Sequence, residues 1–146
     1  MNITIVCDVL GEANNGTTLA AMNLIGYLKE KGHQVTVLCP DQDKLGLPGY
    51  AVVPTWDLGI FNGYVASNGV SLAKPEDSVI SRAIRDADIV HVMLPFPLGR
   101  RAIYLAKQQG IPVSSGFHVM AENVSSHVFL QNCAPANRAI YAYFSK

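Results

Sequence analysis

The sequence predicts an α/β fold in which a parallel β-sheet lies between two layers of helices. Short apolar runs rich in β-branched residues alternate along the chain with segments whose apolar residues recur at helical spacing. Glycine or proline stands at most of the junctions between these segments. Apolar residues make up 49% of the 146 residues, which is enough to fill the core of one domain. Strands that alternate with helices pair in parallel, and helices then cover both faces of the sheet.

Five short apolar runs are expected to form the strands of this sheet. They cover residues 2–9, 34–39, 50–54, 88–94 and 112–117. Between the third and fourth runs, residues 55–75 contain three glycines and end in a proline, which predicts a long irregular loop. Loops of that length often have a function.

Helices are expected over residues 17–31, 76–86, from 98 or 99 to 109, and 135–145. Gly32 and Gly110 directly follow two of these segments, where glycine commonly ends a helix. Helical spacing predicts which side chains face the core. In the first helix they are Leu19, Met22, Leu24, Ile25 and Leu28, and in the second they are Val79, Ala83 and Ile84.

Charge and cysteine content narrow the class of protein. Lysine plus arginine equals aspartate plus glutamate at 11 each, so no net field favours a nucleic-acid partner. The three cysteines are widely spaced, which predicts neither a disulfide framework nor a zinc site. Cys7 and Cys39 lie within apolar runs and are expected in the core. No signal peptide and no run near the roughly 20 apolar residues of a membrane-spanning helix are present, which predicts a cytoplasmic protein.

The loop after the first strand has two interpretations. Gly11 and Gly16 have the spacing of a Walker A loop, but Thr17 stands where the phosphate-binding lysine belongs. A glycine loop that leads into a helix can still hold a phosphate or pyrophosphate on free backbone N–H groups. Alternatively, Gly16 allows a tight turn and Thr17 caps the helix. The sequence leaves both interpretations open.

Two histidines occupy different positions relative to the predicted strands. His91 lies inside an apolar strand, where a histidine is usually a hydrogen-bonded core residue. His118 lies at the carboxyl end of the next strand, at the edge where ligands of such sheets bind. His118, Glu122 and His127 fit no standard zinc spacing, so neither a metal site nor another cofactor is expected.

Three blocks together resemble a known family. The segments GxANNGTT, HVMLPFPLGRRAIYLAKQQGIPV and GFHVMAENVSSH are similar, in this order, to the N-terminal domain of the family 4 retaining glycosyltransferases of GT-B fold. The resemblance covers residues 2 to about 130. Asn15-Gly16 departs from the paired glycines of many relatives.

The resemblance implies a fold, an activity and a set of site residues. The fold would be one incomplete Rossmann-like, acceptor-side domain over residues 1–146, with the donor-binding domain of the family absent from this sequence. The activity would be transfer of a hexosyl group from a nucleotide-sugar, held mainly by that second domain, to a sugar or lipid acceptor. This chain alone would then be inactive. His118 would be catalytic, and donor or acceptor would contact Asn15, Gly16, Thr17, Pro95, Gly99 and Glu122.

Other interpretations remain at this stage. A Rossmann-like module that binds a ligand or regulates a partner, without catalysis, is the alternative function. The basic residues Arg100, Arg101 and Lys107 form either a solvated helix face or a contact with anionic lipid headgroups at the membrane periphery or with a phosphorylated acceptor. Apolar surface left uncovered by an incomplete domain would favour a homodimer.

Overall fold

The computed structural model describes residues 1–8, 10, 16–57, 59 and 73–116. The chain divides into two units, Met1–Gly116 and Phe117–Lys146, and every described residue belongs to the first. Its strands are β1 (Asn2–Val6), β2 (Gln34–Cys39), β3 (Tyr50–Val52), β4 (Ile89–Val92) and β5 (Val113–Ser115). Its helices are α1 (Gly16–Glu30), α3 (Asp77–Ile84), α4 (Pro97–Gln108) and the short 3₁₀ helix η1 (Gln42–Lys44).

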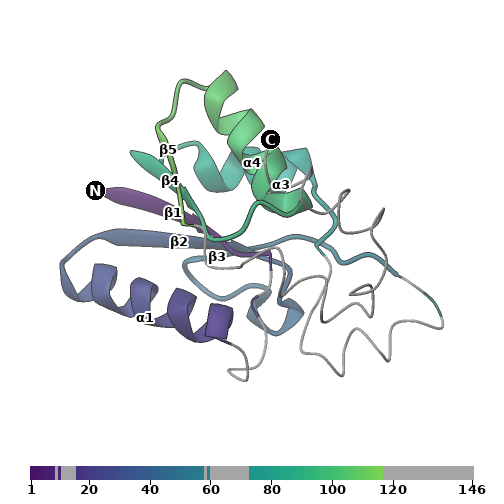
Figure 1. Ribbon diagram of the computed structural model, residues 1–146, viewed down its shortest axis with the longest axis horizontal. Helices are drawn as coiled ribbons and strands as arrows, with labels where there is room; N and C mark the ends of the chain where they lie inside the picture. The colour runs from purple at the N-terminus through teal and green to yellow at the C-terminus, as the bar shows by residue number, and fades with distance from the viewer. Residues whose placement is uncertain (9, 11–15, 58, 60–72, 117–146) are drawn as a thin grey trace, which may run out of the picture. The chain divides into compact units, whose positions relative to one another are not determined.

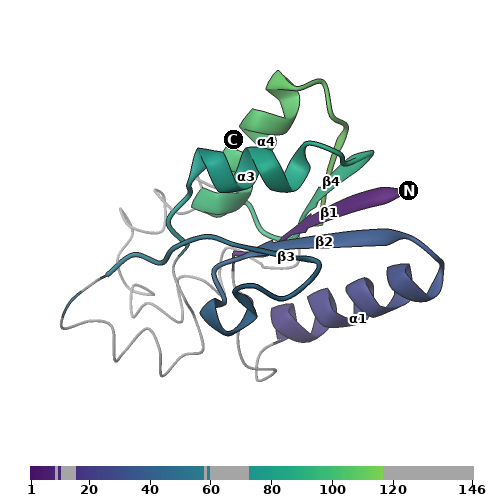
Figure 2. The same ribbon diagram turned by 180° about the vertical axis from the view of Figure 1, so that it is seen from behind.

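The five strands form one parallel sheet in the order β3-β2-β1-β4-β5. The central strand β1 pairs with both neighbours in register, so that Ile3 lies beside Val35 on one side and Ile89 on the other. Helix α1 covers one face of the sheet, while α3 and α4 cover the other (Figures 1 and 2). The predicted three-layer, Rossmann-like α/β fold is therefore confirmed.

The core between the sheet and the pair α3–α4 follows from the alternation of side chains along each strand. Val90 and Val92 of β4 are buried while Ile89 and His91 are only partly so, as expected when alternate residues point to opposite faces. The buried side chains that meet in this layer are Val6, Leu38, Val53, Ala73, Ile80, Ile84, Val90, Val92, Leu98, Ala102 and Ala106.

Helix α1 packs on the sheet through only part of the predicted face: Ile25 is buried and Leu24 and Leu28 are half-buried, as expected. Its buried residues are Thr18, Ala21 and Ile25, whereas Leu19 and Met22 are 47% and 51% exposed. The prediction for these two was wrong because it followed the largest apolar side chains, whereas the first half of the helix packs through the smaller Thr18 and Ala21. At about 100° per residue, Leu19 is turned about 100° from Thr18, and Met22 lies about 40° beyond Thr18, at the border of the buried stripe.

Most other element predictions are confirmed within a few residues at each end. In α3 the deeply buried residues are Ile80 and Ile84, with Val79 and Ala83 partly buried beside them, so the prediction missed Ile80. Gly32 and Gly110 have positive φ values of 82° and 70°, as residues that end helices commonly do. The predicted helix over 135–145 lies outside the described residues.

Part of the predicted long loop is ordered by backbone pairing. Thr55 forms an antiparallel bridge with Ala73, and the N–H of Lys74 donates to the carbonyl oxygen of Pro54 at 2.8 Å. The start and the end of the 55–75 segment are thus held together beyond β3. Residues 58 and 60–72 lie outside the described part of the chain.

We predict that Ile80→Ala lowers the free energy of unfolding by about 2–5 kcal/mol, because removing most of this fully buried side chain leaves a cavity in the core. The matched control is Leu45→Ala, since Leu45 is 68% exposed and its truncation should change stability by no more than about 0.5 kcal/mol. Urea denaturation followed by circular dichroism measures both. Equal effects of the two variants would contradict the assigned core.

Candidate functional site at the carboxyl edge of the sheet

At the carboxyl edge between β1 and β4, the connections that follow the two strands run to opposite faces of the sheet. The connection after β1 leads to α1 on one face, whereas the connection after β4 leads to α4 on the opposite face. This reversal between neighbouring strands is the topological switch point at which open α/β sheets bind ligands. Ladder bonds continue into this edge, from the N–H of Met93 to the Val6 oxygen and from that of Gly116 to the Val92 oxygen.

A buried carboxylate spans this switch point. Asp8, two residues after β1, is only 4% exposed. Its Oδ1 accepts the backbone N–H of Leu98, and its Oδ2 accepts that of Gly99, each at 2.9 Å. Both donors lie in the first turn of α4, where backbone N–H groups have no partner within the helix. Asp8 therefore satisfies two of these groups and places its charge at the positive end of the helix dipole.

Opposing influences act on the Asp8 carboxyl group. Burial disfavours its charged form and raises its pKa from 3.8 to about 7, while the bonds from Gly99 and Leu98 act in the lowering direction. The protonated and the ionised form of Asp8 are therefore both populated near neutral pH. The ionised form accepts both N–H groups fully, whereas a protonated carboxyl group has a hydroxyl in place of one acceptor oxygen.

The absence of a side chain at Gly99 lets α4 approach the sheet. A Cβ atom there would overlap the carbonyl oxygen of Leu94 and lie 2.7 Å from Cγ1 of Val92 and 3.2 Å from Oδ2 of Asp8. Contacts below 3.0 Å are not tolerated without movement, and two of these neighbours belong to the strand and loop that precede the helix. Gly99 is thus required by close packing at the switch point.

The predicted site residues that the structure describes lie at this edge. Gly16 begins α1 and is exposed, and Thr17 follows it inside the first turn, half-buried. Thr17 is therefore not the capping residue, because the helix begins one position earlier than expected. Pro95 lies half-buried in the connection from β4 to α4, next to the Asp8 bonds. Asn15, His118 and Glu122 lie outside the described residues.

The strand histidine and two cysteines behave as the sequence predicted. His91 lies beside Ser114 in the sheet, and its Nδ1 is 2.8 Å from the Ser114 hydroxyl, so it is hydrogen-bonded between β4 and β5. Cys7 and Cys39 are both buried. Burial raises the pKa of the Cys39 thiol to about 11, which keeps it protonated at neutral pH. Within the described ranges, no three His, Cys, Asp or Glu side chains could hold a metal ion.

The basic residues of α4 are partly occupied by contacts within the protein. The guanidinium of Arg101 donates to both carboxylate oxygens of Asp77, at 2.8 and 2.5 Å, and lies 4.9 Å from the ring centre of Tyr104. This pair ties α4 to the start of α3 and lowers the pKa of Asp77 through the bond from Arg101. In the part of the chain that is described, no helix is long and apolar enough to cross a membrane.

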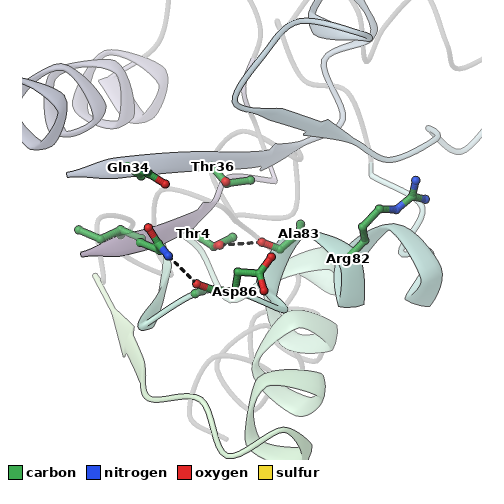
Figure 3. A pocket seen from close by; sticks show the side chains of 9 residues that line it. Thr4, Gln34, Thr36, Arg82, Ala83 and Asp86 are labelled. Atoms are coloured by element: carbon green, nitrogen blue, oxygen red, sulfur yellow. Dashed lines mark hydrogen bonds between the residues drawn. The ribbon is translucent and has the colours of Figure 1, made fainter. Parts of the chain in front are cut away.

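A hollow of about 210 Å³ lies at the opposite, amino edge of the sheet (Figure 3). There the Thr4 hydroxyl donates to the Ala83 oxygen at 2.8 Å, and the Asn2 amide donates to the Asp86 oxygen at 3.0 Å. These bonds satisfy carbonyl groups at the end of α3. The side chains of Asn2 and Thr4 thus serve the end of α3, and the hollow lies away from the switch point.

Gly99→Ala should lower the free energy of unfolding by about 1–3 kcal/mol, because the added methyl group collides with the Leu94 carbonyl. Gly26→Ala is the matched control. Gly26 lies in the middle of α1 with nothing within 4 Å of the added Cβ, so the same change should stabilise by about 0.5–1 kcal/mol. Chemical denaturation of both variants gives the two signs. A neutral Gly99→Ala would show that α4 does not pack as described.

The stability of the wild type relative to Asp8→Asn should fall as pH rises. The unfolded chain loses the Asp8 proton near pH 3.8, whereas the folded chain keeps it up to about pH 7. The raised pKa therefore contributes stability that is complete below pH 3.8 and lost by pH 8. We expect the difference in free energy of unfolding to shrink by about 4 kcal/mol between these limits. Urea denaturation at several pH values measures it, and a difference independent of pH would rule out the raised pKa.

Comparison with known proteins identifies the family of the chain. The sequence is 26% identical, over 94% of its length, to a GDP-mannose-dependent alpha-mannosyltransferase of Corynebacterium glutamicum, and the match spans 34% of that protein. Among solved structures, the C-terminal domain of a hydrogenase from Pyrococcus furiosus is 16% identical, with a TM-score of 0.46 over 80% of this chain and 90% of that one. That likeness is too remote to carry an argument. A model of Glycosyltransferase Family 4 matches residues 14–146, and the chain therefore belongs to this family of glycosyltransferases.

Proposed function

We propose that this chain forms the acceptor side of an enzyme that transfers a hexosyl group from a nucleotide-sugar to a sugar or lipid acceptor. The observation that carries the proposal is the family match over residues 14–146. The mannosyltransferase relative, whose name specifies GDP-mannose, supports a nucleotide-sugar donor. The chain spans about a third of that relative, so a second, donor-binding domain is part of the proposal.

The chemistry of the reaction assigns a task to each side. A bond forms between the anomeric carbon of the hexose and an acceptor hydroxyl oxygen, that oxygen loses its proton, and the nucleoside diphosphate leaves. Negative charge develops on the leaving phosphate, so groups that stabilise it must come from the donor side or from helix N-termini near it. Acceptor binding requires a rigid edge that orients the attacking hydroxyl.

The carboxyl edge of this sheet has the features that the acceptor side needs. Gly16 and Thr17 begin α1, Pro95 lies in the connection into α4, and Gly99 lies in the first turn of that helix, so these residues follow the two strands that meet at the switch point. We place the acceptor against this edge, with Asn15 and Glu122 as further contacts. His118 follows β5, the neighbour of β4, and we assign it to the reaction centre, where its imidazole hydrogen-bonds the hexose or the reacting oxygen.

We expect His118→Ala to lower the rate of hexosyl transfer about 100-fold, because a hydrogen bond formed at the reaction centre is lost. The measurement uses the gene product that contains this sequence, with radiolabelled GDP-mannose and UDP-glucose and a panel of mannosides and lipid acceptors. His33→Ala is the control. His33 lies at the amino edge just before β2, so its loss should change the rate by no more than about two-fold.

The outcomes separate the proposal from its alternative. Transfer that depends on His118 supports the enzyme. Binding of a nucleotide-sugar or glycoside without transfer, under all donor and acceptor combinations, would instead favour a Rossmann-like binding module. Equal loss of activity in both histidine variants would count against the assignment of His118.

A further inference from the structure

The Asp8 carboxylate links, through two hydrogen bonds, two segments that are far apart in the sequence. It follows the central strand β1, and its two acceptor oxygens bind Leu98 and Gly99, which lie 90 and 91 residues away. Each oxygen faces its own donor at the same distance of 2.9 Å, so the planar carboxylate fixes the direction of the first turn of α4 as well as its position. A single hydrogen bond would leave rotation about that bond free.

The first turn of α4, which Asp8 binds, determines the position of the connection Met93–Phe96 at the switch point. Pro97 begins α4, and only the short connection Met93–Phe96 joins it to β4. Met93 and Leu94 are buried, which anchors one end of the connection in the core, while Asp8 anchors the other end through Leu98 and Gly99. The half-buried Pro95 lies between these two anchors. The position of Pro95 at the carboxyl edge therefore depends on Asp8.

Asp8 itself is poorly placed to meet a substrate. It is only 4% exposed, and each carboxylate oxygen already accepts a backbone N–H group. Any effect on a reaction must therefore pass through α4 and its preceding connection. The Gly99 contacts reinforce this coupling, because Oδ2 of Asp8, the Leu94 oxygen and the Val92 side chain all close on the same glycine.

We propose that Asp8 is a positioning residue for acceptor binding, which holds the connection Met93–Phe96 in place through its two bonds to the first turn of α4. This inference rests on the proposed function, since it assumes that an acceptor binds along this edge. Asp8 acts on the acceptor and leaves donor binding unchanged, because the donor is held mainly by the other side of the enzyme.

The first arm of the test observes the bonds directly and requires no catalysis. In ¹⁵N-labelled wild-type chain, the amide signals of Leu98 and Gly99 should shift with pH around a midpoint near 7, the pKa of Asp8. Burial and these two amide groups are the influences on that pKa within the described residues. Asp8→Asn should abolish the titration, because an amide side chain does not ionise. Amide signals of Leu98 and Gly99 that shift at no pH in the wild type and are unchanged by Asp8→Asn would overturn the proposal.

The second arm separates positioning from mere stability. In the gene product that contains this sequence, Asp8→Asn should raise the KM for a mannoside acceptor about ten-fold and leave the KM for the nucleotide-sugar within about two-fold. A partly unfolded population would lower the apparent kcat and leave both KM values unchanged. Asp77→Asn is the matched control, since it removes an exposed carboxylate that also holds α4, through Arg101, without touching the first-turn N–H groups.

The pH dependence gives a further contrast. The wild type becomes less stable as Asp8 ionises, yet only the ionised carboxylate accepts both N–H groups of the first turn of α4 fully. The acceptor KM of the wild type, relative to that of Asp8→Asn, should therefore fall between pH 6 and 8 on the order of several-fold.

The outcomes distinguish this inference from the proposed function. Titrating amides with an unchanged acceptor KM would overturn the positioning role while transfer itself stands. Equal changes in both KM values would also overturn it, because they would indicate a general distortion of the enzyme. Absence of transfer in the wild type would refute the proposed function and this inference with it, and the effect of Asp8→Asn on the Leu98 and Gly99 amide signals would still decide whether the Asp8 bonds exist.

Discussion

The carboxylate of Asp8 is the contact on which the carboxyl edge of this sheet depends. It closes the gap between the central strand and the helix that covers the neighbouring strand, at the edge where the connections after β1 and β4 run to opposite faces of the sheet. Below that bond, α4 presents Leu98, Ala102 and Ala106 to the core, and each is fully buried. Small residues at two of these three positions, and glycine beside the first, let the helix lie close enough for a short side chain such as aspartate to reach it.

Much of the fold follows from local patterns in the sequence, because buried parallel strands are short apolar runs and helices end at glycine. The predicted strand over 34–39 coincides with β2, and Gly32 and Gly110 end α1 and α4. The packing face of α1 followed only in part: Ile25 is buried as predicted, but hydropathy ranks Leu19 and Met22 above the buried Thr18 and Ala21. The sheet instead selects side chains by how closely the helix can approach. That choice depends on the partner surface, which periodicity within the helix does not contain.

The site was predicted less completely than the fold, and Asp8 shows why. Its position at the end of the first strand is visible in the sequence, and so is the PLG segment that begins α4. Their contact joins residues 90 positions apart and exists only once β1 and β4 are known to be neighbours. The signal that could have indicated it is an aspartate after an apolar strand in a protein with a second strand followed by proline, apolar residue and glycine. Gly99 was assigned to the site by resemblance, and its packing against Leu94 supplies the physical reason for a glycine there.

The same bond bears on where a donor diphosphate could contact this edge. A helix N-terminus attracts anions through its free N–H groups and its dipole, and both α1 and α4 begin at the carboxyl edge. At α4, Pro97 has no N–H, and Leu98 and Gly99 donate to Asp8, so an incoming phosphate would find these donors occupied and would meet a carboxylate that is ionised above pH 7. Repulsion between the two anions would oppose binding there. Under the proposed function, the N-terminus of α4 therefore suits a neutral acceptor. Any phosphate contact from this domain is expected at the N-terminus of α1, where no acidic residue lies in the first turn.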